Sequence, residues 1–406
     1  MTLDTGPILR ALLRNKLGAA LIALQIAFTM TVIVNAIFII NERNRLMDRP
    51  SGMEDENLFY VAMVGFGDDY NEEVILNDDL ALLRGTSGIV NASVISSIPV
   101  SGGGSSTGAR LTPDETTPST GTAIYRSDEQ VLDTLNLELI AGEGFTATDM
   151  RLRHEQGPTI ANKAIITRAL AEDLFATEDV NSVLGQTMYL PGNATVQVVG
   201  VVEALQAPWP TSDLVERSTI VPENFLDTFT YIMVRTEPGQ LDRMMGEVEE
   251  LLVANYPDRV IRAVRSMTET RAEVYRVDSA LTTILWVVVA TLIVINCMGI
   301  VGLAVFSINR RRKQIGTRRA LGATRFAILR YFLLENFMIS AVGVTIGAVL
   351  TLTLSIVLTL NFNMPAMAWY YTPVGAAALL LVGQIAALGP STRATRVTPA
   401  TATRTV

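Results

Sequence analysis

Four stretches of the chain are long and apolar enough to cross a membrane as helices, and they span residues 17–40, 280–308, 336–360 and 372–389, the third within a longer segment, 326–360, that begins with a polar lead-in. Crossing about 30 Å of hydrocarbon takes roughly 20 apolar residues, because a helix rises about 1.5 Å per residue. The first stretch has no clear cleavage site after it, so we expect a retained anchor and not a signal peptide. The second is uncharged over 29 residues. As a helix it is about 43 Å long, which predicts a tilted or projecting span.

The region between the first two stretches, residues 41–279, has a different pattern. Gly, Ser, Thr and Pro dominate residues 101–122, which we expect to form a mobile loop. Alternating or β-rich runs predict strands at 58–64, 88–95, 196–202 and 231–234, and amphipathic runs predict helices at 162–175 and 240–255. The chain is therefore predicted to be a membrane protein with four transmembrane α-helices and a large α+β extracytoplasmic domain between helices 1 and 2.

Composition supports this class. Of the 406 residues, 49% are hydrophobic and only 18% are charged, whereas about a quarter are charged in ordinary soluble domains. The single cysteine and the single histidine, Cys297 and His154, exclude a disulfide framework and a His/Cys zinc site. The net charge of -8 argues against nucleic acid as a partner, because phosphate binding requires a basic surface.

Charge is segregated along the chain. Residues 1–16, 309–325 and 390–406 together hold 13 Lys and Arg against one acid, whereas residues 41–279 hold 18 Lys and Arg against 38 acids. Loops rich in Lys and Arg stay in the cytoplasm. We therefore expect a cytoplasmic N-terminus (1–16), a cytoplasmic segment at 309–325 with the lead-in of the third span, and a cytoplasmic tail (390–406). The domain 41–279 and the short link 361–371, with its interfacial aromatic residues, are expected outside.

Candidate chemistry in the extracytoplasmic domain is weak. The glycine-rich run 102–108 lacks the Lys-Ser/Thr ending of a phosphate-binding loop, so nucleotide binding by this chain is not expected. The acidic doublets between residues 68 and 79 lack the ligand spacing of a calcium loop and favour a solvated acidic face. His154 has no nucleophile in a recognisable motif near it, which favours an exposed loop residue.

The basic segment 309–325 carries more information. Ile315, Ala320 and Leu321 are apolar positions near Gly316 and Gly322, among seven cations. A positive flank of a span explains the cations, but it does not explain the apolar positions. We expect a short helix that lies at the membrane surface or in a groove of a partner protein. Because a predicted membrane span adjoins each of its ends, we expect such a helix to transmit displacement to both spans.

This segment resembles the signature of the MacB/FtsX-type ABC transporter permease family. The matching residues are 312–316 (RKQIG), 319–324 (RALGAT) and 332–335 (FLLE), with Gly343 and Gly347 at the outer positions of a glycine-rich step and residues 390–399 at the closing motif. Residues 135–149 and 164–202 also resemble the periplasmic core domain of the family. Two departures are Gln314, where the family usually has Glu, and Val344, where it has Gly.

The resemblance implies a non-catalytic permease subunit of the bacterial inner membrane. MacB carries a fused ATPase domain that is absent here, so a separate ABC ATPase subunit is expected to use ATP and Mg, with no cofactor in this chain. A second permease chain, the same or a paralogue, is expected as well. The resemblance implies helix-packing roles for Glu335, Gly343 and Gly347. It places ATPase coupling on Arg310, Arg311, Arg312, Lys313, Gln314, Ile315, Gly316, Arg319, Ala320, Leu321, Gly322 and Ala323.

Three functions fit this resemblance. The first is export, or efflux, with a periplasmic adaptor. The second is extraction of a lipoprotein or lipid from the membrane. The third is an FtsX-like mechanical regulator that transports nothing and activates a cell-wall hydrolase. In all three, mechanotransmission replaces passage through a channel between the spans.

Polar residues within the spans leave alternatives open. Gln25, Asn35 and Asn296 either bond across helices or are simply tolerated there. Charges in lipid are costly unless they meet protein, water or each other. Arg330 and Glu335 are five residues apart, a poor spacing for a pair on one helix face. We therefore expect Arg330 to snorkel and Glu335 to face another helix.

Overall fold

The computed structural model describes residues 16–67, 70–153, 158–225, 229–362 and 364–396. These residues divide into two compact units, one made of residues up to 45 together with those from 278 onward, and one made of residues 46–277. Several predicted features lie outside the described residues, namely most of the segment 1–16, the acids Asp68 and Asp69, His154 and the end of the closing motif at Pro399.

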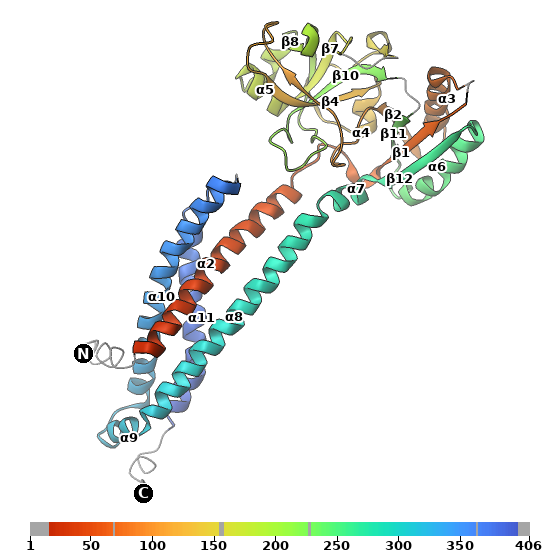
Figure 1. Cartoon of the computed structure of the whole chain (residues 1–406). Coiled ribbons are helices and arrows are strands. Elements are labelled where there is room, and N and C mark those ends of the chain that lie inside the picture. Colours follow the sequence, from red (N-terminus) through yellow and green to blue (C-terminus); the bar gives the residue numbers. More distant parts are fainter. Residues whose placement is uncertain (1–15, 68–69, 154–157, 226–228, 363, 397–406) are drawn as a thin grey trace. The chain divides into compact units, whose positions relative to one another are not determined.

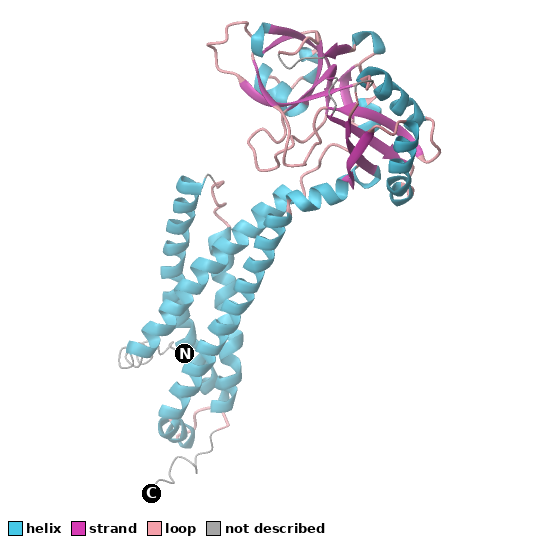
Figure 2. Cartoon of the chain, turned by 45° about the vertical axis from the view of Figure 1, so that its right-hand side comes forward, coloured by secondary structure: helices cyan, strands magenta, loops and turns pink. Residues whose placement is uncertain are grey.

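The helical unit contains four long helices that run side by side (Figures 1 and 2). All four are long and apolar enough to span a membrane, which confirms the predicted number. In a bilayer, a helix satisfies its own backbone hydrogen bonds, so an uncharged apolar run of this length adopts one. The helices are α2 (Lys16–Met47), α8 (Arg276–Arg310), α10 (Arg325–Phe362) and α11 (Tyr371–Ala394), and the short α9 (Arg312–Ala320) joins α8 to α10.

The spans extend beyond their apolar cores. At about 1.5 Å per residue, the 35 residues of α8 rise about 52 Å, well above the thickness of a hydrocarbon core. Near its start, Asp278 forms an ion pair with Arg43 of α2. The aromatic link before α11 stacks Tyr370 on Tyr371, with ring centroids 4.9 Å apart. Polar and aromatic residues therefore extend both helices past the apolar run.

Helix α2 lies at the centre of the helical core. Its buried residues, which include Ile26, Met30 and Val34, pack against Val289 of α8, Ile339 of α10 and residues of α11. The other helices expose apolar side chains in the isolated chain. On α8, for example, Val287 and Val294 are exposed. Such surfaces suit a lipid environment, where apolar side chains meet acyl chains at no cost.

Residues 46–277 form an α+β unit, as predicted. Its main sheet has the strand order β12-β1-β11-β2-β4-β10-β7-β9-β5, and three short strands pair beside it: β3 with β4, β6 with β10 and β8 with β9. The strands are β1 (Leu58–Gly65), β2 (Ile89–Ile95), β3 (Ser106–Ala109), β4 (Thr120–Ser127), β5 (Leu139–Gly142), β6 (Arg151–Arg153), β7 (Lys163–Thr167), β8 (Thr187–Leu190), β9 (Ala194–Val202), β10 (Ser218–Phe225), β11 (Phe229–Thr236) and β12 (Arg259–Ser266). The α-helices are α3 (Glu72–Arg84), α4 (Val131–Leu135), α5 (Arg168–Phe175), α6 (Leu241–Asn255) and α7 (Met267–Val274).

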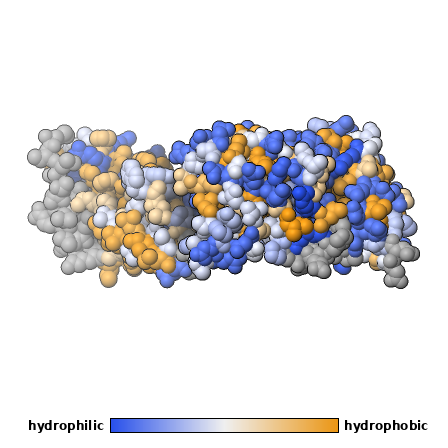
Figure 3. All heavy atoms as spheres, turned by 90° about the horizontal axis from the view of Figure 1, so that it is seen from above, coloured by the Kyte–Doolittle hydropathy of each residue, from blue (hydrophilic) through white to orange (hydrophobic). Residues whose placement is uncertain are grey.

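One half of this unit is a split βαβ sandwich. The elements β1-α3-β2 and β11-α6-β12 form an antiparallel sheet ordered β12-β1-β11-β2, which is the ferredoxin-like arrangement. Helices α3 and α6 cover one face through Leu80 and Val248, which pack on Phe59 and Val61. The elements from β3 to β10 are inserted between β2 and β11 and have a core of their own around α5. Figure 3 shows that the viewed surface is mostly hydrophilic, with separate hydrophobic patches.

Two local predictions were wrong in part. The helix predicted at 162–175 begins only at Arg168, because Lys163–Thr167 pairs with both β9 and β10 as strand β7. The β-branched residues of β7 are buried by the neighbouring strands of the sheet, and a local sequence pattern does not reveal these neighbours. The loop predicted at 101–122 contains β3 paired with the start of β4. There Thr122 is fully buried and bonds to Thr219, with the two hydroxyls 3.0 Å apart.

Candidate functional site

Short hydrogen-bonded turns bound helix α9 on both sides. The backbone leaves the α8 geometry at Arg311, and α9 ends at Ala320. Gly322 follows with a φ of +95°, a left-handed conformation that glycine adopts without the steric penalty of a Cβ. Thr324 then caps α10, because its hydroxyl accepts a hydrogen bond of 3.2 Å from the Ala327 N–H. The sequence therefore forms a short helix, bounded by turns, between two long helices.

One side of α9 is fixed to the rest of the helical unit. Ile315 and Gly316 are buried, and Ile315 packs with Ile308 of α8 and with Phe332 of α10. On the C-terminal side, the Arg319 guanidinium donates a hydrogen bond of 2.6 Å to the Thr395 carbonyl, just after α11. Apolar and polar contacts thus couple α9 to the ends of three long helices, so a displacement of α9 displaces these ends too.

Several residues of α9 and of the segment that follows it are exposed. Leu321 is 83% exposed and Phe326 is 70% exposed. Arg319 and Ala323 are half-buried, and the remaining predicted coupling residues Arg310, Arg312, Lys313, Gln314, Ala320 and Gly322 are exposed. We call Ala320, Leu321 and Phe326 the exposed apolar ridge. Exposed apolar residues with cations close by in the sequence are typical of an interaction surface.

An ion pair joins the α8–α9 junction to α10. The Arg311 guanidinium donates to Glu335, with 3.0 Å between Nη1 and Oε2, and also to the Tyr331 hydroxyl at 3.2 Å. Both side chains are mostly enclosed, Arg311 being 18% exposed and Glu335 9%. Arg330 is exposed. The partner of Glu335 is instead Arg311, at the junction of α8 and α9. The sequence reasoning missed Arg311 as this partner, because only the turn at Arg311 brings residues 24 positions apart together.

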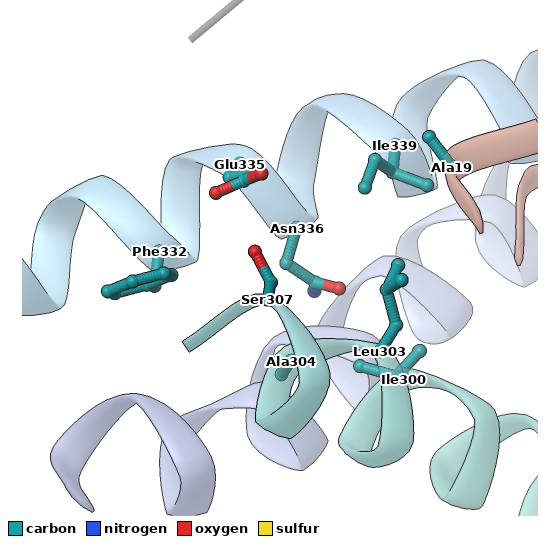
Figure 4. Close-up of a pocket in the computed structure, with 9 residues that line it drawn as sticks. All are labelled: Ala19, Ile300, Leu303, Ala304, Ser307, Phe332, Glu335, Asn336 and Ile339. Atoms are coloured by element: carbon teal, nitrogen blue, oxygen red, sulfur yellow. The ribbon is translucent and has the colours of Figure 1, made fainter. Parts of the chain in front are cut away.

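A small cavity lies beside this ion pair, between α2, α8 and α10. Its wall is largely apolar, but Ser307, Glu335 and Asn336 add polar atoms to it (Figure 4). Its volume is about 30 Å³, which is room for about one water molecule and not for a solute. The Asn336 amide donates a hydrogen bond of 3.1 Å to the Gly383 carbonyl of α11. The helices are therefore closely packed in this part of the helical unit.

The two glycines assigned to helix packing, Gly343 and Gly347, lie against α2. A Cβ at Gly343 would be 2.7 Å from the Ala23 carbonyl oxygen, and one at Gly347 would be 2.9 Å from the Met30 Cβ. Both distances are shorter than a normal van der Waals contact. The helices approach this closely only because position 343 and position 347 carry no side chain.

Two of the three polar residues considered in the spans bond across helices. The Gln25 amide donates to the Ile295 carbonyl at 3.0 Å, and the Asn35 amide donates to the Thr351 carbonyl at 3.4 Å. Asn296 is 1% exposed, and neither atom of its amide has a hydrogen-bond partner among the described residues. The alternative of cross-helix bonding therefore holds for Gln25 and Asn35 only.

Two of the buried acidic residues of the 46–277 unit form ion pairs with arginines inside the fold. No three His, Cys, Asp or Glu side chains of the described residues converge to hold a metal ion. The solvated face expected for the acidic doublets was wrong for Asp79, which is buried and pairs with Arg259. Glu223 of β10 is fully buried and pairs with Arg126 at 3.0 Å. Burial raises the pKa of Glu223, but hydrogen bonds from Thr159, Ala161 and Ile160 and the charge of Arg126 outweigh burial and leave this pKa below 4.5.

Sequence comparison gives two family matches. The family described as "MacB-like periplasmic core domain" matches residues 19–251, and "FtsX-like permease C-terminal" matches residues 286–399. An uncharacterised ABC transporter permease of Bacillus subtilis, YknZ, is 23% identical over 274 residues, which cover 66% of this chain and 66% of that protein. The macrolide export ATP-binding/permease protein MacB of Wolinella succinogenes is 25% identical over 214 residues, which cover 50% of this chain and 32% of that protein.

The match to that MacB protein spans only about a third of its length. Among solved structures, the periplasmic region of MacB from Actinobacillus actinomycetemcomitans aligns with 57% of this chain and 97% of its own, at 16% identity and a TM-score of 0.35. The first family match alone spans more than half of the chain, and the second adds the helices that follow. The chain therefore belongs to the MacB/FtsX-type ABC transporter permeases.

Proposed function

We propose that the chain is the permease subunit of an ABC transporter and couples ATP hydrolysis in a separate ATPase subunit to movement of its own 46–277 unit. The exposed apolar ridge beside α9 carries this proposal. It presents Leu321 and Phe326 to the outside while Ile315 and Arg319 tie α9 to three long helices. A partner that binds the ridge and changes shape pulls on all of these helices together.

The charge distribution supports a specific orientation of the chain in the membrane. The ridge lies in the basic segment 309–325, and residues 41–279 carry an excess of acids. By the positive-inside rule, the ridge faces the cytoplasm, where ATP is available, and the 46–277 unit lies on the periplasmic side of the inner membrane. The termini are then cytoplasmic as well.

Helix α8 is the element that transmits the motion. Its 35 residues run without interruption from the turn at Arg311 to Arg276, where Tyr275 connects it to α7 and so to strand β12. A continuous helix resists bending, so displacement of one end moves the other. No catalytic residue is assigned to this chain; ATP, Mg and the hydrolysis belong to the ATPase. A second permease chain, identical or paralogous, completes the complex.

Export with a periplasmic adaptor is the function we favour. Relatives named as macrolide export proteins support it. Extraction of a lipoprotein or lipid, and mechanical activation of a cell-wall hydrolase, remain outcomes of the test. Affinity purification of the tagged full chain in mild detergent, with mass spectrometry and an ATPase assay, separates these functions by the partner recovered.

The same preparation tests the coupling surface. Replacing Ala320 and Leu321 together by Asp puts two charges on the exposed apolar ridge, so the ATPase should be lost from the purified complex or its activity uncoupled. Val74→Asp is the matched control, because Val74 is also an exposed apolar residue but lies in α3 of the other unit. If the double variant retains the ATPase and its coupling like the control, the docking assignment is refuted. If the unaltered chain recovers no ATPase, the transporter function itself is refuted.

A further inference from the structure

A second pocket lies between α9 and the start of α10. Its volume is about 90 Å³, three times that of the cavity beside Glu335. Gln314 and Arg318 line it from one face of α9, and Arg311 lines it from the turn just before α9. Tyr331 lines it from α10, and Ile315 and Phe332 form its apolar floor. We call this space the α9–α10 pocket.

Hydrogen-bond donors without acceptors converge on this pocket. Within the described part of the chain, no oxygen accepts a hydrogen bond from the Arg318 guanidinium, which lies over the Tyr331 ring at 5.2 Å from its centroid. Among the described residues, Arg311 bonds to Glu335 and Tyr331 through its Nη1 alone. The Tyr331 hydroxyl accepts that bond and so retains its own proton for donation.

The charged residues near the pocket are almost all positive. Glu335 is the only acid between residues 279 and 406, and it is already paired with Arg311. Exposed cations at Arg310, Arg325 and Arg330 are close in sequence to the residues that line the pocket. Residue 314 in the pocket wall is Gln, which is neutral and does not repel an anion. The amide of Gln314 also adds donors.

We propose that the α9–α10 pocket binds the headgroup phosphate of an anionic membrane phospholipid. The planar guanidinium groups of Arg311 and Arg318 match the geometry of phosphate oxygens. Basic pockets at the ends of membrane helices are typical places for anionic headgroups. The pocket also lies at the end of a membrane span, because α10 continues from Tyr331 into its apolar run. Acyl chains of a lipid held here lie along that helix, so lipid binding fixes α9 against α10.

Native mass spectrometry of the full chain, purified in mild detergent from its membrane, tests this site. We expect one anionic phospholipid per chain to survive purification. Arg318→Gln should lower its occupancy about tenfold, because a charge-assisted hydrogen bond to phosphate contributes enough for that factor. Gln314→Glu changes no volume at an exposed helix position and should lower the occupancy similarly through repulsion.

Arg312→Gln is the matched control, because it removes the same charge from α9 but Arg312 does not line the pocket. Retained lipid in this variant together with loss in Arg318→Gln and Gln314→Glu supports the site. Equal losses in Arg312→Gln and Arg318→Gln reduce the effect to diffuse surface charge and overturn the proposal. Displacement of the lipid by millimolar inorganic phosphate, or absence of any retained anionic lipid, also overturns it.

Discussion

The close contact between α2 and α10 allows a quantitative test with one substitution, Gly343→Leu. The added Cβ would meet the Ala23 carbonyl oxygen at 2.7 Å and the Ile26 Cβ at 2.9 Å. Optimal contacts between carbon atoms are about 3.5 to 4.0 Å long. Neither neighbour is the end of a flexible side chain, so the helices must separate by about 1 Å.

The expected cost follows from this separation. Overpacking a close contact destabilises by up to about 3 kcal/mol. Leu also stabilises a helix interior by about 0.8 kcal/mol relative to Gly, which offsets part of that cost. The net loss in the free energy of unfolding is about 2 kcal/mol. For a unit of this size, it corresponds to a melting temperature about 4 to 8 °C lower.

The assay is thermal unfolding of the purified full chain in detergent, followed by loss of the monodisperse species. Gly302→Leu is the control, because a Cβ at Gly302 meets no atom within 4 Å. We expect this control to melt at the wild-type temperature or slightly above, since only the helix propensity changes. If Gly343→Leu melts like Gly302→Leu, then α2 and α10 do not approach at this position and the packing assignment for Gly343 is wrong.

Three further predictions concern the ion pairs. Glu335→Gln leaves the mostly enclosed Arg311 without a counter-charge and should destabilise the helical unit by about 2 kcal/mol, less than a fully buried pair because Arg311 keeps some solvent; thermal unfolding checks this, and a much smaller further loss is expected when Arg311→Gln is added. Glu223→Gln leaves Arg126 and Arg153 near a buried neutral group and should cost about 3 kcal/mol. Because the pKa of Glu223 is lower in the folded chain than its usual 4.5, the ionised group stabilises the fold above that pH, and this contribution is lost as the pH falls through the lower folded-state value; Glu223→Gln should therefore unfold with a shallower acid dependence in a pH titration. Asp149 behaves in the same direction: burial opposes its ionisation, but bonds from Lys163 and Thr146 hold its pKa at about 2 against 3.8, so Lys163→Gln should raise the pH at which acid unfolding begins.

The sequence by itself determined the membrane architecture. Long uncharged apolar runs, here of 18 or more residues, have one stable backbone conformation in lipid, so the four spans could be located from the sequence alone. The α+β character of residues 46–277 and four of its strands also followed from local alternation or β-rich runs, as at Leu58–Gly65 and Ala194–Val202. The motifs of the basic segment indicated the family, which the family matches confirmed.

Contacts between residues distant in the sequence needed the tertiary structure. The strand at Lys163–Thr167 reads locally as part of a helix, and only pairing with β9 and β10 stabilises it as a strand. The pairing of Arg311 with Glu335 depends on the turn that separates α8 from α9, and no spacing rule connects the two residues. The α9–α10 pocket arises from the same turn. Local periodicity decides which segments are helices or strands, whereas long-range packing decides which of their charges and glycines meet.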